Sequence, residues 1–432
     1  MRYKICQKGE RISLIFPNFA SMTTERPLSG SLPSDATTDF ILRHRNDDVR
    51  RLALHPSPGV DMPYALDQIQ GWQTACHKLP LWAATDGIIF PPHLNMEQCS
   101  SEQTAKYKAD IAGRLLANYD ETATLIDLTG GFGVDFSIMA RRIPRAIYVE
   151  RNTKLCEIAR HNLQLLGLEN FQVVNADSSE FLKGFTPTGD TLFFLDPARR
   201  DTHGHKVYGI EDCSPDILKL KDSLLVKSQH VIVKLSPMLD WHEAVRQLGR
   251  SVCEVHIVSA ANECKELLLV LCSKGNDKET IKLVCANDDS YFETVLSQTS
   301  TKISTAVRLT DNLSTHYVYI PNASIMKAGV FAPLCDAFPV AMVDVNSHIF
   351  LSNENIDDFP GRRYTLLTST SMNKRELKEK LHDIERANIA VRNFPLSAPE
   401  LRKKLKMKDG GNITIFATTF QSKHVLLIVE SK

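Results

Sequence analysis

From about Thr124 to Cys272, short apolar runs alternate regularly with helix-like stretches. This alternation predicts parallel strands covered by helices on both faces. The last two apolar runs have no full helix between them, which indicates an antiparallel hairpin at the sheet edge. The expected fold class is therefore α/β, with a doubly wound, seven-stranded Rossmann-like sheet. The expected strands are 124–129, 145–150, 171–175, 191–196, 230–235, 252–260 and 265–272, and the expected helices lie near 134–142, 153–166, 178–184, 213–227 and 238–248.

The regions on either side of this alternation have different patterns. The part before it is helical, and one expected helix begins near Ser101, where Ser100 and Gln103 have the spacing of a capping box. The part after it contains two small α+β patterns, the second of which reads βαβαββ. Met22 is an alternative first residue of the chain. The expected domains are an N-terminal segment 1–37 without predicted structure, a helical region 38–120, the alternating domain 121–275, a small module 276–360 and a basic unit 361–432.

Composition excludes several classes of protein. Lys and Arg balance Asp and Glu at 51 each, which argues against a wholly basic nucleic-acid binder. No run approaches the roughly 18–20 apolar residues of a membrane span, and the N-terminus lacks a small-residue cleavage site. The ten cysteines form no CxxC, CxxxC or Cys/His pattern. They predict reduced, buried thiols in a cytoplasmic protein without a metal site. Nothing in the composition indicates an oligomeric state.

A glycine-rich turn follows the first expected strand. Residues 121–135 read ETATLIDLTGGFGVD, with Gly130, Gly131 and Gly133 directly after the apolar run. Glycines at this place let a ligand approach the backbone at the switch point of a doubly wound sheet, although they also serve tight packing.

Acidic residues end the next three expected strands. Glu150 ends the second strand, where a carboxylate can accept hydrogen bonds from ribose hydroxyls. Asp177 follows the third strand, where it can accept from an adenine amino group or cap the following helix. Asp196-Pro197 follows the fourth strand and places a carboxylate over the crevice in which doubly wound enzymes carry out their chemistry.

The four strand ends DLTGGFGVD, YVE, NAD and DPAR resemble motifs I to IV of the class I S-adenosylmethionine-dependent methyltransferases, over about residues 100–272. The resemblance implies S-adenosylmethionine as the cofactor, with Glu150 on its ribose and Asp177 on its adenine. A nicotinamide-dependent dehydrogenase would share the glycines and the acid on the second strand. It does not account for NAD or DPAR, and GGFGVD lacks the third glycine of GxGxxG. The residues implied to line the methionine side of the cofactor are Asp127, Gly130, Gly131 and Gly133.

The whole chain is also similar to a smaller group of methyltransferases. Their N-terminal helical region precedes the catalytic domain, which is followed by a ferredoxin-like module and a C-terminal THUMP-like domain. The stretches that carry this likeness are EQCSSEQTAKYKA, DLTGGFGVDF, DPARR and RNFPLSAPELRKKLK. Because THUMP domains elsewhere bind RNA, often tRNA, the resemblance implies an RNA substrate, with tRNA as the expected class.

Two classes of acceptor remain open on the residues. Enzymes that methylate a base nitrogen carry (Asp/Asn/Ser)-Pro-Pro-(Tyr/Phe/Trp) at the fourth strand. Here Asp196-Pro197 fits, whereas Ala198 and Arg199 replace the second proline and the aromatic residue. A guanidinium plane can also stack on a base, so the expected catalytic residues are Asp196, Pro197 and Arg199. The alternative is a ribose 2′-hydroxyl, methylated by a Lys-Asp-Lys-Glu set. Its candidates are Lys108, Asp196, Lys234 and either Glu263 or Glu266.

Other functions are weaker on the same residues. Methylation at carbon-5 of a pyrimidine needs a cysteine nucleophile, which related enzymes carry just after the fifth strand. Ser236-Pro237 stands there instead, and Cys213 and Cys264 lie elsewhere in the sequence. A non-catalytic RNA-binding protein that keeps the cofactor fold and a small-molecule methyltransferase are the remaining alternatives.

The C-terminal unit is strongly basic. From Gly361 onward there are 15 Lys and Arg against 7 Asp and Glu. Such a cluster can hold an RNA backbone through counterion release, and its alternative interpretation is an exposed helix face. The expected RNA-binding residues are Arg402, Lys403, Lys404, Lys406 and Lys408.

Overall fold

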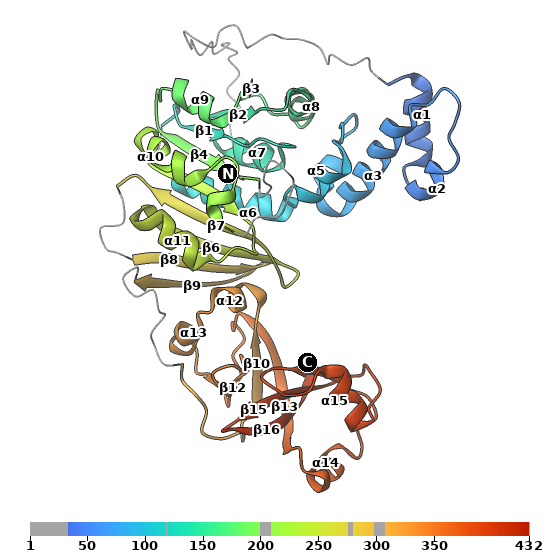
Figure 1. Ribbon diagram of the computed structural model, residues 1–432, viewed down its shortest axis with the longest axis vertical. Helices are drawn as coiled ribbons and strands as arrows, with labels where there is room; N and C mark the ends of the chain where they lie inside the picture. The colour runs from blue at the N-terminus through green and yellow to red at the C-terminus, as the bar shows by residue number, and fades with distance from the viewer. Residues whose placement is uncertain (1–32, 118–119, 199–208, 275–279, 298–306, 432) are drawn as a thin grey trace, which may run out of the picture. The chain divides into compact units, whose positions relative to one another are not determined.

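The computed structural model describes residues 33–117, 120–198, 209–274, 280–297 and 307–431 (Figure 1). These residues form two compact units. The first contains the described residues up to Ile232 except 209–212, and the second contains 209–212 and the residues from Val233 onward. The proposed alternative start at Met22 lies outside the described residues.

The first unit begins with the expected helical region. Its first helix starts at Asp35, capped by the Ser34 hydroxyl, so helical structure begins slightly earlier than the predicted boundary at 38. Among the residues that the model describes, no helix has the length and apolar character needed to cross a membrane. The helices of this region are α1 (Asp35–His44), α2 (Val49–Ala53), α3 (Met62–Lys78), α4 (Pro80–Ala83), α5 (His93–Gln98) and α6 (Glu102–Leu115).

The capping box predicted at the start of α6 is wrong by one residue. The Ser101 hydroxyl, not that of Ser100, accepts the backbone N–H of Thr104 at 3.2 Å. Ser100 is buried, and its hydroxyl donates to a carboxylate oxygen of Asp135 at 2.7 Å. Long-range packing therefore takes Ser100 away from the local role that its spacing predicts.

The alternating region forms the expected sheet, with two additional strands. Hydrogen bonds join the strands in the order β3-β2-β1-β4-β5-β7-β6-β8-β9. β1 pairs in parallel with β2 and β4, and β6 pairs antiparallel with β7, as expected for the hairpin. The strands are β1 (Thr124–Asp127), β2 (Arg145–Glu150), β3 (Phe171–Asn175), β4 (Thr191–Leu195), β5 (His230–Leu235), β6 (Val252–Ala260), β7 (Glu263–Cys272), β8 (Thr280–Asn287) and β9 (Ser290–Ser297).

The two additional strands correct two sequence predictions. β8 pairs in parallel with β6 and antiparallel with β9, so the β6–β7 hairpin is not the edge of the sheet. Residues 280–297 also belong to this sheet rather than to the separate module expected from 276. Their apolar residues, such as Leu283 and Cys285, are buried in it.

Helices follow the strands as the alternation predicts. Strand β1 is buried along its whole length, as is β4, which explains why their sequences are continuously apolar. The helices are α7 (Val134–Met139), α8 (Thr153–Leu165), α9 (Ser178–Gly184), α10 (Ile217–Lys227) and α11 (Trp241–Leu248).

The remainder of the second unit is one mixed sheet with four helices. Its strand order is β11-β12-β10-β13-β16-β15-β14, so the strands before and after residue 361 share a single sheet. A common core contains Val318 and Leu351 from one part and Phe416 and Leu427 from the other. The elements are β10 (Tyr317–Pro321), α12 (Ala323–Ala328), α13 (Phe331–Ala337), β11 (Ala341–Met342), β12 (Phe350–Ser352), β13 (Gly361–Ser371), α14 (Lys374–Leu381), β14 (Asn388–Val391), α15 (Ala398–Leu405), β15 (Ile413–Phe420) and β16 (Lys423–Ser431).

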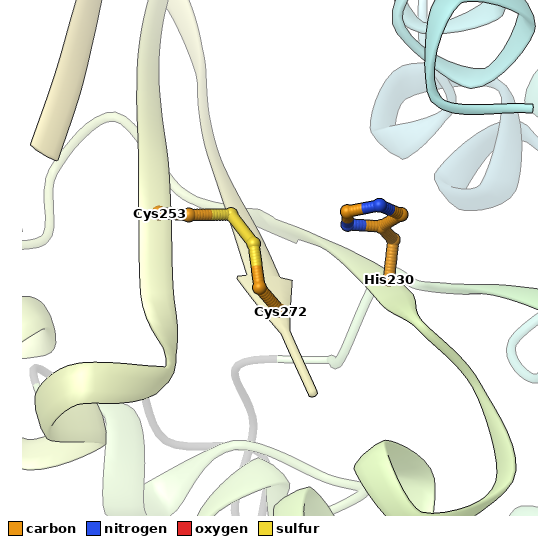
Figure 2. A group of neighbouring side chains, drawn as sticks. All are labelled: His230, Cys253 and Cys272. Atoms are coloured by element: carbon orange, nitrogen blue, oxygen red, sulfur yellow. A yellow bond between two sulfur atoms is a disulfide. The ribbon is translucent and has the colours of Figure 1, made fainter. Parts of the chain in front are cut away.

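The prediction of reduced thiols is wrong for two cysteines. Cys253 and Cys272 form a disulfide, which Figure 2 draws together with His230. The two cysteines are 19 residues apart, and the antiparallel pairing of β6 with β7 brings their Cα atoms to 6.1 Å, within the range that a disulfide spans. Both sulfur atoms belong to this bond, so neither is a thiolate that could bind a metal ion.

Candidate active site

A cavity of about 530 Å³ lies in the first unit, at the carboxyl ends of β1 and β2 and the segments that follow β3 and β4. This is the place where doubly wound sheets bind their ligands. The cavity brings together seven of the predicted site residues, namely Asp127, Gly130, Gly131, Gly133, Glu150, Asp177 and Asp196. Pro197 is buried next to it, and Arg199 lies outside the described residues.

The glycines of this turn are required for two different physical reasons. Gly131 and Gly133 adopt φ angles of 55° and 86°, in the left-handed region that other residues rarely occupy. At Gly130 a Cβ atom would lie 2.2 Å from the ring of Tyr148, so the core leaves no room for a side chain there. The Tyr148 hydroxyl in turn donates to the carbonyl oxygen of Gly131 at 2.5 Å. Packing therefore explains Gly130 without a ligand, which the sequence could not show.

Phe132 packs the glycine turn against the N-terminal helical region. Its buried ring lies 4.6 Å, centroid to centroid, from Trp82 and 6.4 Å from Phe90. Aromatic pairs at these separations stabilise beyond the area that they bury. The helical region is thus part of the wall that holds the cavity in shape.

Glu150 is hydrogen-bonded to the backbone of the glycine turn. One of its carboxylate oxygens accepts the Gly131 N–H at 3.0 Å, and the other accepts the Asn152 N–H at 2.8 Å. Each oxygen retains a further lone pair, so the carboxylate can still accept hydrogen bonds from a ligand. The two backbone bonds fix its orientation before any ligand arrives.

Asp177 takes the capping role that was its alternative interpretation. Its Oδ1 accepts the backbone N–H of Ser179 at 2.8 Å and that of Glu180 at 3.4 Å, which caps α9. Because the residue also lines the cavity and is exposed, capping and ligand binding are compatible.

Asp127 and Asp196 are linked through one hydroxyl-bearing residue. The backbone N–H of Thr129 donates to Asp127 at 2.9 Å, and the Thr129 hydroxyl oxygen accepts the Asp196 N–H at 2.6 Å. Burial raises the pKa of Asp127 well above its usual value, and the carboxylates of Asp135, Asp196 and Glu150 raise this pKa further. A cation placed here would relieve the repulsion, so the electrostatics of the cavity favour a positively charged ligand.

Two parts of the cavity wall were missed by sequence reasoning. One is the end of α5 and the turn after it, which contribute Asn95, Gln98 and Ser100. The other is the segment Ser214–Asp216, which is tied to the DPAR strand end by two backbone hydrogen bonds between Ala198 and Ser214, at 2.8 and 2.9 Å. Asp216 caps α10, and its Ser-Pro-Asp sequence before an apolar run is the local signal that could have located this wall.

The residues of the two alternative acceptor chemistries are placed differently from Asp196. Lys108 is completely buried and pairs with Asp135 at 3.1 Å, and it is absent from the described lining of the cavity. Lys234 and Glu266 are buried in the second unit, whereas Glu263 is exposed. Cys213 and Cys264 are likewise absent from the described lining, and burial raises the pKa of Cys264.

The basic cluster lies on the second unit, at the end of α15 and in the turn after it. Lys403, Lys404, Lys406 and Lys408 are exposed. Arg402 forms an ion pair with Asp409, so it is partly neutralised. Three basic residues also occupy the last turn of α15, where they favourably oppose the helix dipole.

Comparison with known proteins agrees with this geometry. Two family models match the second unit, a ferredoxin-like domain over residues 317–360 and a THUMP domain-like family over residues 361–431. Proteins from two strains of Mycobacterium tuberculosis, CDC 1551 and H37Rv, are described as uncharacterized S-adenosylmethionine-dependent methyltransferases. Each is 23% identical over 341 residues, which cover 78% of this chain and 84% of the relative.

A solved structure extends the likeness to nearly the whole chain. A proposed methyltransferase from Porphyromonas gingivalis W83 is 31% identical, covers 92% of this chain and 97% of its own, and superposes with a TM-score of 0.79. The chain belongs to the S-adenosylmethionine-dependent methyltransferases. S-adenosylmethionine is therefore the cofactor of this methyltransferase.

The cavity of the methyltransferase fits that cofactor. S-adenosylmethionine carries two positive charges, on its sulfonium and its α-ammonium group, and one carboxylate. Among the described residues that line the cavity, six are acidic and one, Arg151, is basic. The acidic residues are Asp127, Asp135, Glu150, Asp177, Asp196 and Asp216.

Proposed function

We propose that this methyltransferase transfers the methyl group of S-adenosylmethionine to a base nitrogen of RNA, with tRNA as the RNA class. The observation that carries the proposal is the THUMP-like match over residues 361–431, together with the exposed lysines on that same domain. The cytoplasm, which contains both RNA and the cofactor, is the proposed place of action. In this proposal, catalysis takes place in the alternating region, and the C-terminal unit contacts the RNA.

The cofactor is assigned to the residues that end the strands. The Glu150 carboxylate, already fixed by two backbone N–H groups, accepts hydrogen bonds from the ribose hydroxyls. Asp177 accepts from the adenine amino group while its Oδ1 caps α9. Asp127 and the turn formed by Gly130, Gly131 and Gly133 receive the methionine end. When bound, the cofactor supplies an electrophilic methyl group on a sulfonium.

Asp196 is the residue proposed to act on the acceptor. Its backbone is held by the Thr129 hydroxyl, and Pro197 restricts the chain directly after it. The carboxylate would accept a hydrogen bond from the target amine and orient its nitrogen toward the methyl group, so that proximity supplies much of the rate. Arg199 is proposed to stack on the base.

The placement of Lys108 favours a base over a ribose acceptor. A lysine that helps to deprotonate a 2′-hydroxyl must reach the substrate, but the Lys108 ammonium group donates to Ser100 and pairs with Asp135 in the protein interior. With Lys108 engaged in this way, the Lys-Asp-Lys-Glu set lacks its first member. A catalytically silent RNA-binding protein is disfavoured because the cavity retains the acidic strand ends that the cofactor needs.

The test is transfer of a labelled methyl group to RNA. The protein would be incubated with deuterated-methyl S-adenosylmethionine and total RNA from cells that lack this gene, and the digested nucleosides analysed by mass spectrometry. We expect label on a base and at least a hundred-fold lower rate for Asp196→Asn, with cofactor affinity within a few-fold of wild type. Label on ribose would contradict the base assignment. Absence of label in all RNA, with cofactor binding intact, would contradict the RNA substrate.

A further inference from the structure

A buried cation lies behind the glycine turn. Lys108, on α6, is 0% exposed, and its Nζ lies 3.1 Å from Oδ1 of Asp135 and 3.1 Å from the Ser100 hydroxyl. The Ser100 hydroxyl donates to Oδ2 of Asp135 at 2.7 Å. Both oxygens of the Asp135 carboxylate are therefore held in place by residues of the helical region.

Two of these three residues line the cavity. Ser100 and Asp135 line the cavity, whereas Lys108 lies behind them and is not among its described lining. Asp135 is in the first turn of α7, two residues after Gly133. A carboxylate held by Ser100 and Lys108 is thus presented to the cavity beside the glycine turn.

Two carboxylates near the glycine turn line the cavity. Asp127 precedes the turn in the sequence and Asp135 follows it, and the Lys108 ammonium group pairs with Asp135. The charge of Asp135 also contributes to the raised pKa of Asp127, so the two carboxylates are close enough to repel each other. A ligand ammonium group between them would meet two partners that are already in position.

We propose that Asp135 binds the α-ammonium group of S-adenosylmethionine, and that Lys108 and Ser100 position Asp135 for this contact. Asp135 is outside the set of cofactor residues that the strand ends imply. Lys108 is a positioning residue, because it acts on the cofactor only through Asp135. The proposal requires the cofactor alone and is independent of the RNA substrate.

The test compares ligands with and without the amino-acid end. Dissociation constants of the full chain would be measured by calorimetry for S-adenosylmethionine, S-adenosylhomocysteine and 5′-methylthioadenosine, which has the adenosine and thioether but no ammonium group. We expect Asp135→Asn to weaken the first two by about 10- to 100-fold, as for a lost charge-assisted hydrogen bond, and the third by less than two-fold. The control Glu150→Gln should weaken all three, because all three contain the ribose.

Variants of the positioning residues separate the proposed contact from a general loss of structure. Lys108→Met should show the same ligand pattern, and Lys108→Arg should restore part of the affinity. The double variant Lys108→Met/Asp135→Asn should bind no more weakly than Asp135→Asn, because both changes affect one contact. Ser100→Ala, which keeps the ion pair, should weaken only the two amino-acid ligands, by about two- to five-fold. Equal losses for 5′-methylthioadenosine, or unchanged affinity for S-adenosylmethionine in Asp135→Asn, would overturn the proposal.

Discussion

At the scale of single residues, the cavity depends on carboxylates held in fixed positions before a ligand binds. Glu150 accepts two backbone N–H groups, and Asp135 is fixed by Ser100 and Lys108. Asp127 differs from these, because its burial makes ionisation costly in the absence of a cation. The part of the cavity beside the glycine turn therefore combines one carboxylate that is paired in advance with another that becomes charged most easily when a cation is present.

Cofactor binding should release a proton from Asp127. Because its pKa is raised in the free protein and a nearby cation lowers it, the complex binds fewer protons than the free protein. Affinity for S-adenosylmethionine should therefore rise with pH, from the ordinary range of an Asp up to the raised pKa, and level off above it. Calorimetric titrations in two buffers of different ionisation enthalpy would measure the released proton.

Asp127→Asn is the control for this proton linkage. It should abolish the proton release attributed to Asp127 and reduce affinity at high pH by about ten-fold or more, as expected for a lost charged partner. Affinity that is independent of pH in the wild type would contradict the assignment.

At the scale of elements, α15 carries a basic cluster on a well-defined helix. A capping box between Ser397 and Glu400 starts the helix, and Leu401 anchors it in the core of the C-terminal unit. The lysines at its other end therefore have a fixed place, as a surface that binds a phosphate backbone requires. Substitutions can therefore test whether the positions of these lysines matter for binding.

Removing the cluster should weaken RNA binding and its dependence on salt. We expect Lys403, Lys404, Lys406 and Lys408, all changed to Gln, to reduce tRNA affinity and to lower the slope of log K against log salt by up to about 3. Filter binding at several salt concentrations would measure both quantities. The matched control changes four exposed basic residues of α14 to Gln, namely Lys374, Arg375, Lys378 and Lys380. An equal loss from the α14 variant would show that net charge, rather than this cluster, determines binding.

Elements were predicted well where local signals and burial agree. The strands β2, β3, β5 and β6 have the predicted bounds, because each contains buried apolar residues that distinguish it from the polar segments on either side. Ser100 was misjudged, because its spacing fits a cap while its real partner, Asp135, is 35 residues away. Strands β8 and β9 were assigned to the wrong module, because sequence does not show which sheet an alternating strand joins. The sequence also did not reveal that Ser214–Asp216 belongs to the cavity wall, because its contact with Ala198 joins residues that are distant in the sequence.

At the scale of the whole molecule, the two C-terminal family matches do not correspond to two independent folds. The ferredoxin-like residues 317–360 and the THUMP-like residues 361–431 contribute neighbouring strands, β10 and β13, to one sheet. Their side chains meet in one core that includes Val318, Ile349 and Leu427. The THUMP-like part has a second core of its own around Leu401, but the apolar face that each part contributes to the shared core is covered only in the presence of the other part.

Truncation should reveal this dependence. A chain that ends after residue 360 keeps β10 but loses β13, which exposes an unpaired strand edge and the apolar face of Val318. We expect this chain to aggregate. A chain that ends after residue 306 removes the whole sheet and should still bind S-adenosylmethionine, since the cavity lies in the first unit. Light scattering and calorimetry would measure the two outcomes. Solubility of the 360-residue chain would contradict the shared core.

The shared sheet also has a consequence for how the ferredoxin-like and THUMP-like segments evolve. A rearrangement that moved only the coding sequence for residues 361–431 into another gene would deliver a polypeptide with one complete core, one incomplete core and an open strand edge. Selection would remove most such recombinants before any benefit from the proposed RNA contact could appear. The ferredoxin-like and THUMP-like segments should therefore be gained and lost as a pair across genomes, and the breakpoints of such events should fall before residue 317.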